Sequence, residues 1–251
     1  MTLPAFTDDG GPGPAVVLLH SFLMDGRMFA PQLPALDGFR RITIDERGHG
    51  GTPAEGPFDY WDVARDVLAV LDHLGVSRAA VVGTSQGGFV ALRLALLAPS
   101  RVSCLAVLGT SAAAEDPAVA AGYRAVLDAW VTGGAPPEVL DGVATICFGA
   151  FEVGEWKQRW ASVAPDQLTW TMTALVDRDA VLDRVPEITC PALVLHGTAD
   201  LAYPVERAAE LAAALPGAAE PVVVEGGAHF LSYTHADEVN PHLARFLKAH
   251  A

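Results

Sequence analysis

Cysteine and basic residues are scarce in this chain of 251 residues. Its three cysteines, Cys104, Cys147 and Cys190, lie far apart in mostly apolar segments, which predicts reduced core residues and argues against a disulfide framework. Lys and Arg total 16 against 30 Asp and Glu, and the resulting net charge of -14 is spread along the chain. An acidic surface of this kind disfavours nucleic acid and anionic membranes as partners.

Long hydrophobic runs and metal-binding motifs are also missing. The first apolar run, Ala15 to Leu19, is too short to span a bilayer, and the acidic Asp8 and Asp9 precede it where a secretory signal carries positive charge. The eight histidines are scattered, without the close spacing of metal ligands. These absences predict a globular protein of the cytoplasm that holds no metal.

Short apolar runs alternate with amphipathic segments along most of the chain. With 51% hydrophobic and 18% charged residues, the sequence can bury a large core. The alternation predicts an α/β fold, in which helices cover both faces of a mostly parallel, doubly wound sheet. The expected strands are Ala15 to Leu19, Arg41 to Ile44, Ala79 to Val82, Val102 to Leu108, Ala192 to Leu195 and Pro221 to Val224.

This alternation stops between residues 112 and 183, where no strand-like run occurs. We expect residues 112–183 to form a helical cap over the carboxyl edge of the sheet, and residues 1–111 and 184–251 to form the core domain. Most of the aromatic residues in this segment are expected to pack within the cap itself. The candidates for contact with a substrate are Trp130, Phe148, Trp156 and Trp160.

The segment Gly83-Thr84-Ser85-Gln86-Gly87 follows an expected strand and opens a helical segment. A serine on such a sharp turn exposes its hydroxyl above the edge of the sheet, while the glycines relieve crowding between strand and helix. A nucleophilic serine also needs a base and donors for the oxyanion. Ser85 is therefore the candidate nucleophile, although an ordinary glycine-rich turn has the same pattern.

A base and an orienting acid are expected on later loops at the same edge of the sheet. Asp200 follows the strand Ala192 to Leu195, and His229 follows the strand Pro221 to Val224. Their order after Ser85 is that of a Ser-Asp-His triad. Taken separately, Asp200 also fits a turn and His229 a loop histidine, whereas their joint placement with Ser85 favours catalysis.

Two backbone amides are candidates for the oxyanion donors. Gln86 opens the helix after Ser85, and Phe22 follows the first buried strand, where the second donor of such sites lies. His20 and His49 compete with His229 for the role of base. Both precede the serine in the sequence, and we expect them to hold loops together.

Five motifs mark the strand ends: His20-Ser21-Phe22-Leu23, Asp45-Glu46-Arg47-Gly48-His49-Gly50, Gly83-Thr84-Ser85-Gln86-Gly87-Gly88, Cys190 to Asp200 and Gly226-Gly227-Ala228-His229. With them, nearly the whole chain resembles the α/β-hydrolase superfamily. The resemblance implies Ser85 as nucleophile, His229 as base, Asp200 as orienting acid, and Phe22 and Gln86 as oxyanion donors. It also implies that the cap is inserted after the sixth strand. The chain departs from the family in its short segment before Ala15, which predicts a reduced N-terminal strand pair.

Within the superfamily the chain is similar to the 3-oxoadipate enol-lactonases, through Ser21, the stretch Asp25 to Gln32, the Asp45 to Gly50 loop and Asn240. The sequence thus predicts a cofactor-independent serine hydrolase of the esterase or lactonase branch, with a small-molecule ester or lactone as its substrate. A serine on the turn argues against haloalkane dehalogenase and epoxide hydrolase, which use a carboxylate there.

Two alternatives stay open, and one feature bears on the substrate. A cofactor-free perhydrolase or haloperoxidase uses the same triad, and a small-molecule receptor of this fold binds without turnover. The segment from residue 112 to residue 183 contains four basic and eleven acidic residues. This acidic, aromatic segment favours neutral, apolar substrates over the carboxylate-bearing lactone of the enol-lactonases.

Overall fold

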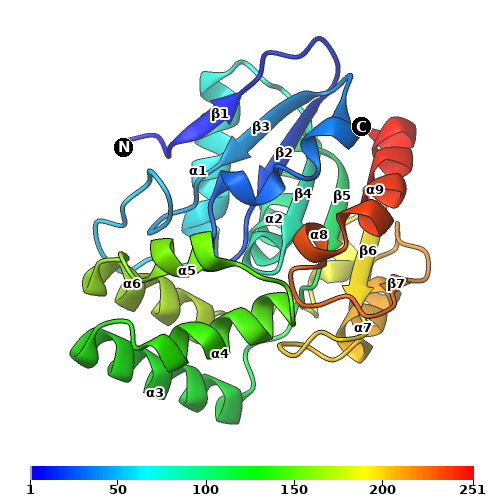
Figure 1. Cartoon of the computed structure of the whole chain (residues 1–251). Helices are drawn as coiled ribbons and strands as arrows, with labels where there is room; N and C mark the ends of the chain where they lie inside the picture. The colour runs from blue at the N-terminus through cyan, green and yellow to red at the C-terminus, as the bar shows by residue number, and fades with distance from the viewer. Residues whose placement is uncertain (1) are drawn as a thin grey trace.

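Residues 2–251, the part of the chain that the computed structural model describes, contain one seven-stranded sheet of order β1-β3-β2-β4-β5-β6-β7 (Figure 1). β1 runs antiparallel to β3, and the other neighbouring strands are parallel. The α/β class and the mostly parallel sheet predicted from the sequence are confirmed. The strands are β1 (Phe6–Asp8), β2 (Ala15–Leu19), β3 (Arg40–Ile44), β4 (Ala79–Thr84), β5 (Val102–Leu108), β6 (Ala192–Gly197) and β7 (Val222–Val224).

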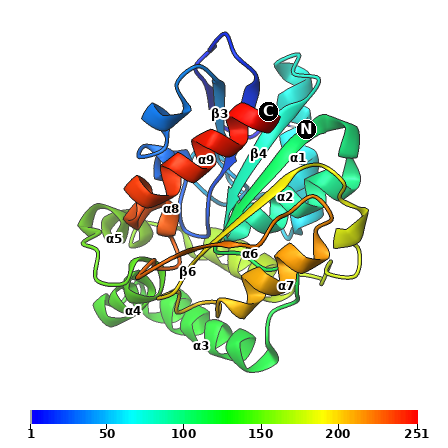
Figure 2. The same cartoon turned by 90° about the vertical axis from the view of Figure 1, so that its right-hand side faces the viewer.

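Helices cover both faces of the sheet because successive side chains of a strand point to opposite sides. In β2, Val17 and Leu19 belong to the hydrophobic cluster that includes α1, α2 and α7, whereas Val16 and Leu18 belong to the cluster that includes α9. Figure 2 shows α9 and α2 on opposite sides of the strands. The bounds are α1 (Tyr60–His73), α2 (Gln86–Leu97), α7 (Glu206–Ala214), α8 (Leu231–Thr234) and α9 (Ala236–His250). Short 3-10 helices are η1 (Gly26–Phe29), η2 (Leu33–Leu36), η3 (Pro99–Arg101) and η4 (Val185–Glu187).

The number of strands before the insertion differs from the prediction. The sequence predicts a shortened strand pair ahead of Ala15 and hence an insertion after the sixth strand, but residues 2–14 contain one strand, β1, so that the insertion follows the fifth strand, β5. The segment between β1 and β2, Asp9 to Pro14, has only six residues, of which three are glycine and two are proline, a composition that favours a turn. A Cβ on Gly11 would lie 2.3 Å from the carbonyl oxygen of Phe39, and a Cβ on Gly13 would lie 1.8 Å from that of Gly38. The segment between β1 and β2 therefore passes close to the turn before β3 as a glycine- and proline-rich connection and contributes no second strand.

The insertion between β5 and β6 consists of helices and the loops that join them. Its helices are α3 (Pro117–Gly133), α4 (Pro137–Phe148), α5 (Gly154–Trp160) and α6 (Pro165–Val176). They lie together beyond the carboxyl ends of the strands (Figure 1). Among residues 2–251, no helix combines the length and the apolarity needed to cross a bilayer.

The two ends of the insertion lie side by side. The Val181 amide donates to the Ala112 carbonyl at 2.8 Å. The buried Arg178 guanidinium donates to the Glu115 carboxylate at 2.9 Å and to the Ala113 carbonyl at 3.2 Å. The inserted segment therefore leaves and rejoins the rest of the chain at one place, while its division from the core as a separate cap stays a prediction.

Candidate active site

Ser85 occupies a strained turn between β4 and α2. Its φ is +51°, in the left-handed region that residues with a side chain rarely adopt. The turn needs its glycines, since a Cβ on Gly83 would lie 2.2 Å from the Gly87 carbonyl oxygen and one on Gly87 would lie 2.0 Å from that of Leu19. The tight packing of α2 against the ends of β2 and β4 thus fixes the serine at the carboxyl edge of the sheet.

The structure brings Ser85, His229 and Asp200 together from three loops at this edge. His229 Nε2 lies 2.8 Å from Ser85 Oγ, and His229 Nδ1 lies 2.8 Å from Asp200 Oδ2. All three side chains are buried. The other oxygen of Asp200 accepts the amides of Ala202 and Tyr203 at 2.8 and 2.9 Å. This is the arrangement of a nucleophile, a base and an orienting acid.

The acid of this group is held in its ionised form. Burial by itself raises the pKa of Asp200, but the neighbouring His229, through its charge and hydrogen bond, and the Tyr203 amide together hold that pKa below its usual value. An ionised Asp200 accepts the Nδ1–H of His229, which leaves the Nε2 lone pair facing the serine hydroxyl. The geometry therefore supports proton transfer from Ser85 to His229.

A second histidine also contacts the acid. His196, at the end of β6, places Nε2 3.2 Å from Asp200 Oδ2 and 3.0 Å from the Tyr203 carbonyl oxygen. Its ring is fully buried. The sequence predicts only that His196 lies at the end of a strand. Its position four residues before Asp200 is the one feature of the sequence that could have indicated the contact.

The loop after β2 brings Ser21 and Phe22 to the same cavity as Ser85. The Ser21 carbonyl accepts from His20 Nδ1 at 2.8 Å and from the Met24 amide at 3.0 Å, which fixes the plane of the Ser21 to Phe22 peptide. Within residues 2–251, neither the Phe22 amide nor the Gln86 amide donates a hydrogen bond to another group of the chain. Two unused amides near Ser85 are suited to bind an oxyanion.

His20 and His49 hold this region together. His20 Nε2 accepts the Glu46 amide at 2.8 Å, and His49 Nδ1 donates to the Arg47 carbonyl at 2.9 Å. Burial lowers the pKa of His20 to about 4 and that of His49, which also lies beside His20, to about 3. Rings with such low pKa values are poor proton acceptors near neutral pH, so both are unsuited to the role of base.

Glu46 is a buried acid whose environment the sequence did not reveal. Its Oε2 accepts the Gln86 side-chain amide at 2.7 Å, and the Tyr60 hydroxyl donates to the Gln86 Oε1 at 3.2 Å. The other oxygen of Glu46 has no partner within residues 2–251. Burial raises the pKa of Glu46 to about 8. This network turns the Gln86 side chain away from the serine, and only the Gln86 backbone is left for the oxyanion.

A cavity of about 290 Å³ opens onto Ser85 and His229 and extends between the helices of the insertion. Its walls are mainly apolar. In the described part of the chain, no lysine or arginine lines this cavity, and the exposed Glu138 is its one acidic residue. The lining includes Phe22, Tyr123, Trp130, Ile146, Met172 and Leu175.

Of the four aromatic residues predicted to contact a substrate, the structure places only Trp130 in this cavity. The prediction needs correction for Phe148, Trp156 and Trp160. Phe148 is buried against Trp160 and Phe230, with ring centroids 6.1 and 5.1 Å apart. Trp156 and Trp160 lie against a different cavity. These three side chains serve as the packing between the insertion and the core, since their large apolar surfaces gain most by burial there.

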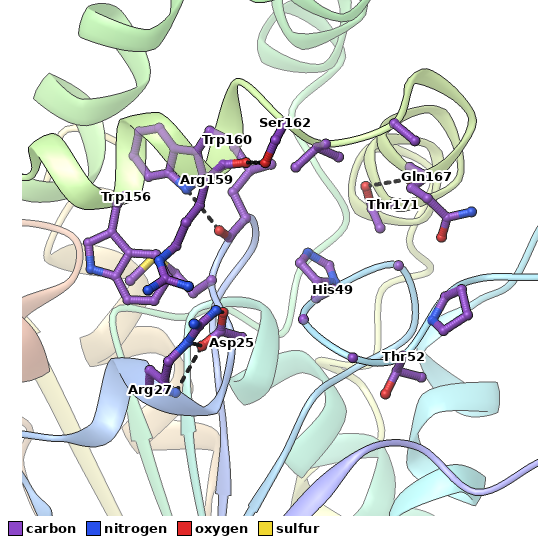
Figure 3. Close-up of a pocket in the computed structure, with 18 residues that line it drawn as sticks. Asp25, Arg27, His49, Thr52, Trp156, Arg159, Trp160, Ser162, Gln167 and Thr171 are labelled. Carbon is purple, nitrogen blue, oxygen red and sulfur yellow. Dashed lines mark hydrogen bonds and ion pairs between the residues drawn. The ribbon is translucent and has the colours of Figure 1, made fainter.

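A second cavity of about 410 Å³ lies on the other side of the Phe22 loop and does not reach Ser85. Figure 3 shows it between α5, which carries Arg159, and the loop that carries His49. An ion pair between Asp25 and Arg27 lies at its edge. This cavity is the more polar of the two, but it contains none of the predicted catalytic residues.

The four cations of the insertion are all paired with acids. Arg178 pairs with Glu115 in the interior, and the other three form pairs nearer the surface. The surface pairs are Arg124 with Asp177, Lys157 with Asp141 and Arg159 with Glu155. No cation of the insertion is therefore directed at the Ser85 cavity within residues 2–251.

Comparisons with known proteins agree with this site. A family model described as alpha/beta hydrolase fold matches residues 14–236. The chain is 28% identical to a putative non-heme chloroperoxidase of Synechocystis sp., over 98% of this chain and 96% of that protein. Among solved structures, the enol-lactonase of Burkholderia xenovorans is 28% identical with a TM-score of 0.87, covering 97% of this chain and 96% of its own. A thermophilic esterase of Thermogutta terrifontis is 26% identical with a TM-score of 0.87, covering 98% and 93%.

Proposed function

The chain belongs to the alpha/beta hydrolase fold family, and we propose that it is a serine hydrolase that cleaves a carboxylic ester or lactone through an acyl-enzyme on Ser85. The observation that carries the proposal is the position of His229, 2.8 Å from the serine hydroxyl on one side and 2.8 Å from the Asp200 carboxylate on the other. Relatives of the family include an esterase and an enol-lactonase.

The geometry supports a two-step reaction. His229 takes the proton of Ser85 as Oγ bonds to the carbonyl carbon, and the oxyanion that forms accepts the Phe22 and Gln86 amides. The tetrahedral intermediate collapses, and His229 gives its proton to the leaving alkoxide. A water molecule, deprotonated by His229, then attacks the acyl-enzyme and releases the carboxylic acid and the serine. Asp200 stabilises the positive charge that His229 carries in both steps.

We infer that the acyl group of the substrate is neutral and largely apolar. A carboxylate in a partly desolvated site needs a cationic partner. The Ser85 cavity is lined instead by apolar side chains and by the acidic Glu138. The basic residues of the insertion form ion pairs with other acids. Residues 112–183 would then act as a cap that forms the acyl pocket. An enol-lactone that carries a carboxylate is a poor fit to these walls.

The test combines covalent labelling with turnover. A fluorophosphonate probe is expected to label the wild type once, at Ser85, and the wild type is expected to hydrolyse p-nitrophenyl butyrate and an uncharged lactone. Ser85→Ala should abolish labelling and lower kcat by roughly 10⁴ to 10⁶. Ser162 lines the second cavity, so Ser162→Ala serves as the matched control. This variant should keep both the labelling of Ser85 and the turnover of the wild type. Labelling at another residue, or equal turnover by Ser85→Ala, would contradict the proposal.

A perhydrolase or haloperoxidase-like activity is the second candidate, favoured by the similarity to a putative non-heme chloroperoxidase. In that reaction hydrogen peroxide replaces water as the acyl acceptor, so that the acyl-enzyme yields a peracid and free serine. Peracid formed from acetate and hydrogen peroxide should be measured beside ester hydrolysis. A higher kcat/KM for peracid formation than for any ester would make this the main activity.

A further inference from the structure

The loop that carries the Phe22 amide contains a strained residue. In residues 2–251, Leu23 and Ser85 are the two non-glycine residues with positive φ, at +61° and +51°. Leu23 is the third residue of a turn closed by the hydrogen bond from the Met24 amide to the Ser21 carbonyl. Glycine normally occupies a position with positive φ in such a turn, because other residues pay roughly 1–2 kcal/mol there. Leu23 persists in this conformation only if its surroundings hold it.

Trp160, the last residue of α5, holds Leu23 from the side of the insertion. Its indole Nε1 donates to the Leu23 carbonyl at 2.8 Å, an interaction drawn as a dashed line from Trp160 in Figure 3. Trp160 is fully buried and Leu23 is nearly so. Without the indole N–H, the Leu23 carbonyl would be a buried acceptor with an unmet hydrogen bond.

The same loop is fixed from the core by a different group. His20 Nδ1 donates to the Ser21 carbonyl at 2.8 Å, on the peptide whose N–H belongs to Phe22. The turn around Phe22 is thus held at both ends, by His20 at Ser21 and by Trp160 at Leu23. An oxyanion donor acts only when it lies about 2.7–3.1 Å from the oxyanion, so a small shift of the turn weakens it.

We propose that Trp160 is a positioning residue of the oxyanion hole: its indole N–H holds the strained Leu23, so that the inserted helices complete the donor loop as well as forming the acyl pocket. This inference rests on the proposed serine hydrolase function. It accounts for a fully buried tryptophan that does not line the Ser85 cavity. It predicts that loss of one N–H, outside contact with the substrate, slows the chemical step.

The test removes the N–H and keeps the ring. Trp160→Phe keeps an aromatic ring against Phe148, and Trp160→β-(3-benzothienyl)alanine, made by amber suppression, keeps the shape of tryptophan with sulfur in place of N–H. The half-buried Trp170 of α6 lines neither cavity, so Trp170→Phe is the matched control. For each variant, kcat and KM for p-nitrophenyl butyrate, the inhibition constant of butylboronic acid and Tm are measured.

Both Trp160 variants should lower kcat roughly five- to twentyfold, part of the roughly 10²- to 10³-fold that loss of a whole oxyanion donor costs. KM should stay within about twofold, and the inhibition constant of the boronate, whose tetrahedral adduct occupies the oxyanion hole, should rise with the loss in kcat. Trp170→Phe should leave kcat, KM and the inhibition constant of the boronate unchanged. If the phenylalanine variant unfolds, the benzothienyl variant decides.

Two results would overturn the inference alone: a kcat equal to that of an active wild type in the benzothienyl variant, or a rise in KM with kcat unchanged, which would mean that Trp160 contacts the substrate. Absence of turnover and of Ser85 labelling in the wild type would overturn the proposed function and this inference with it.

Discussion

Two cavities lie on either side of the Phe22 loop, and each contains a buried histidine. In the Ser85 cavity, His229 has a hydroxyl on one ring nitrogen and a carboxylate on the other. In the second cavity, His49 donates to the Arg47 carbonyl through Nδ1, and its Nε2 has no partner within residues 2–251. The residue type is the same, but only His229 has the partners that the proposed roles require, a carboxylate that can orient the ring and a hydroxyl that the ring can deprotonate. A carboxylate on one ring nitrogen and a hydroxyl on the other, and not burial or the presence of a cavity, suit a histidine to the role of base.

The largest effect we expect separates these two histidines. His229→Ala should lower kcat by roughly 10³ to 10⁵, because the ring is the proposed proton acceptor. His49→Gln should lower kcat by less than roughly tenfold and should lower Tm, because a buried loop contact is lost. The measurements are steady-state turnover of p-nitrophenyl butyrate and thermal unfolding by circular dichroism.

Comparable losses of kcat in the two variants would break the comparison between the cavities. Near-normal turnover by His229→Ala, with a large loss in His20→Ala or His49→Gln, would reassign the base to the histidines upstream of the serine.

The next effect concerns Glu46, which lies on the loop after β3 that also carries His49. Its pKa is raised from 4.5 to about 8 because the carboxyl is buried. The folded protein therefore holds a proton that the unfolded chain releases near pH 4.5. The stability that this proton provides is complete below pH 4.5 and is lost as the pH rises toward 8.

The glutamine of Glu46→Gln cannot ionise, so the variant should not lose stability as the pH rises from 5 to 8. Relative to the wild type, the variant should gain stability between pH 5 and pH 8, on the order of 4 kcal/mol if the whole shift is expressed. This corresponds to a Tm difference that grows by roughly 8–16 °C across that range. Thermal unfolding of both proteins at pH 5, 6, 7 and 8 measures it. A Tm difference that does not depend on pH would show that Glu46 is ionised in the folded protein.

The smallest effect tests the charge of the Ser85 cavity. Glu138 is its one acidic residue in the described part of the chain, and it is exposed, so salt and water screen it. Glu138→Gln should raise kcat/KM for a carboxylate-bearing lactone by roughly two- to threefold at low salt and less at high salt. The kcat/KM for a neutral ester of the same size should not change. A wild type that prefers the anionic lactone would refute the inferred neutral substrate.

The sequence predicted that Ser85, Asp200 and His229 lie together because each follows a strand at the same edge of the sheet. Ser85 directly follows β4, and Asp200 and His229 lie on the loops after β6 and β7, where parallel strands place such positions side by side. The structure joins them by hydrogen bonds. Local patterns sufficed here because the sheet, and not the details of packing, sets the distances.

The residues of the insertion were harder to predict because tertiary packing places them. Trp130 and Trp160 both lie on amphipathic helices, yet one lines the Ser85 cavity and the other donates to the Leu23 carbonyl. The spacing of the tryptophans in the sequence does not predict which of them lines the cavity and which donates to the loop. The burial of Glu46 was hidden for the same reason, since its partner Gln86 is distant in sequence.

The paired ends of the insertion have an evolutionary consequence. Because Val181 bonds to Ala112 and Arg178 bonds to Glu115, the segment between them begins and ends at one point of the molecule. A lineage can lengthen, shorten or exchange such a segment by recombination without displacing β5 or β6. Under the proposed function, such an exchange would alter the acyl pocket and leave Ser85, Asp200 and His229 in place, provided that each new segment still supplies a donor for the Leu23 carbonyl.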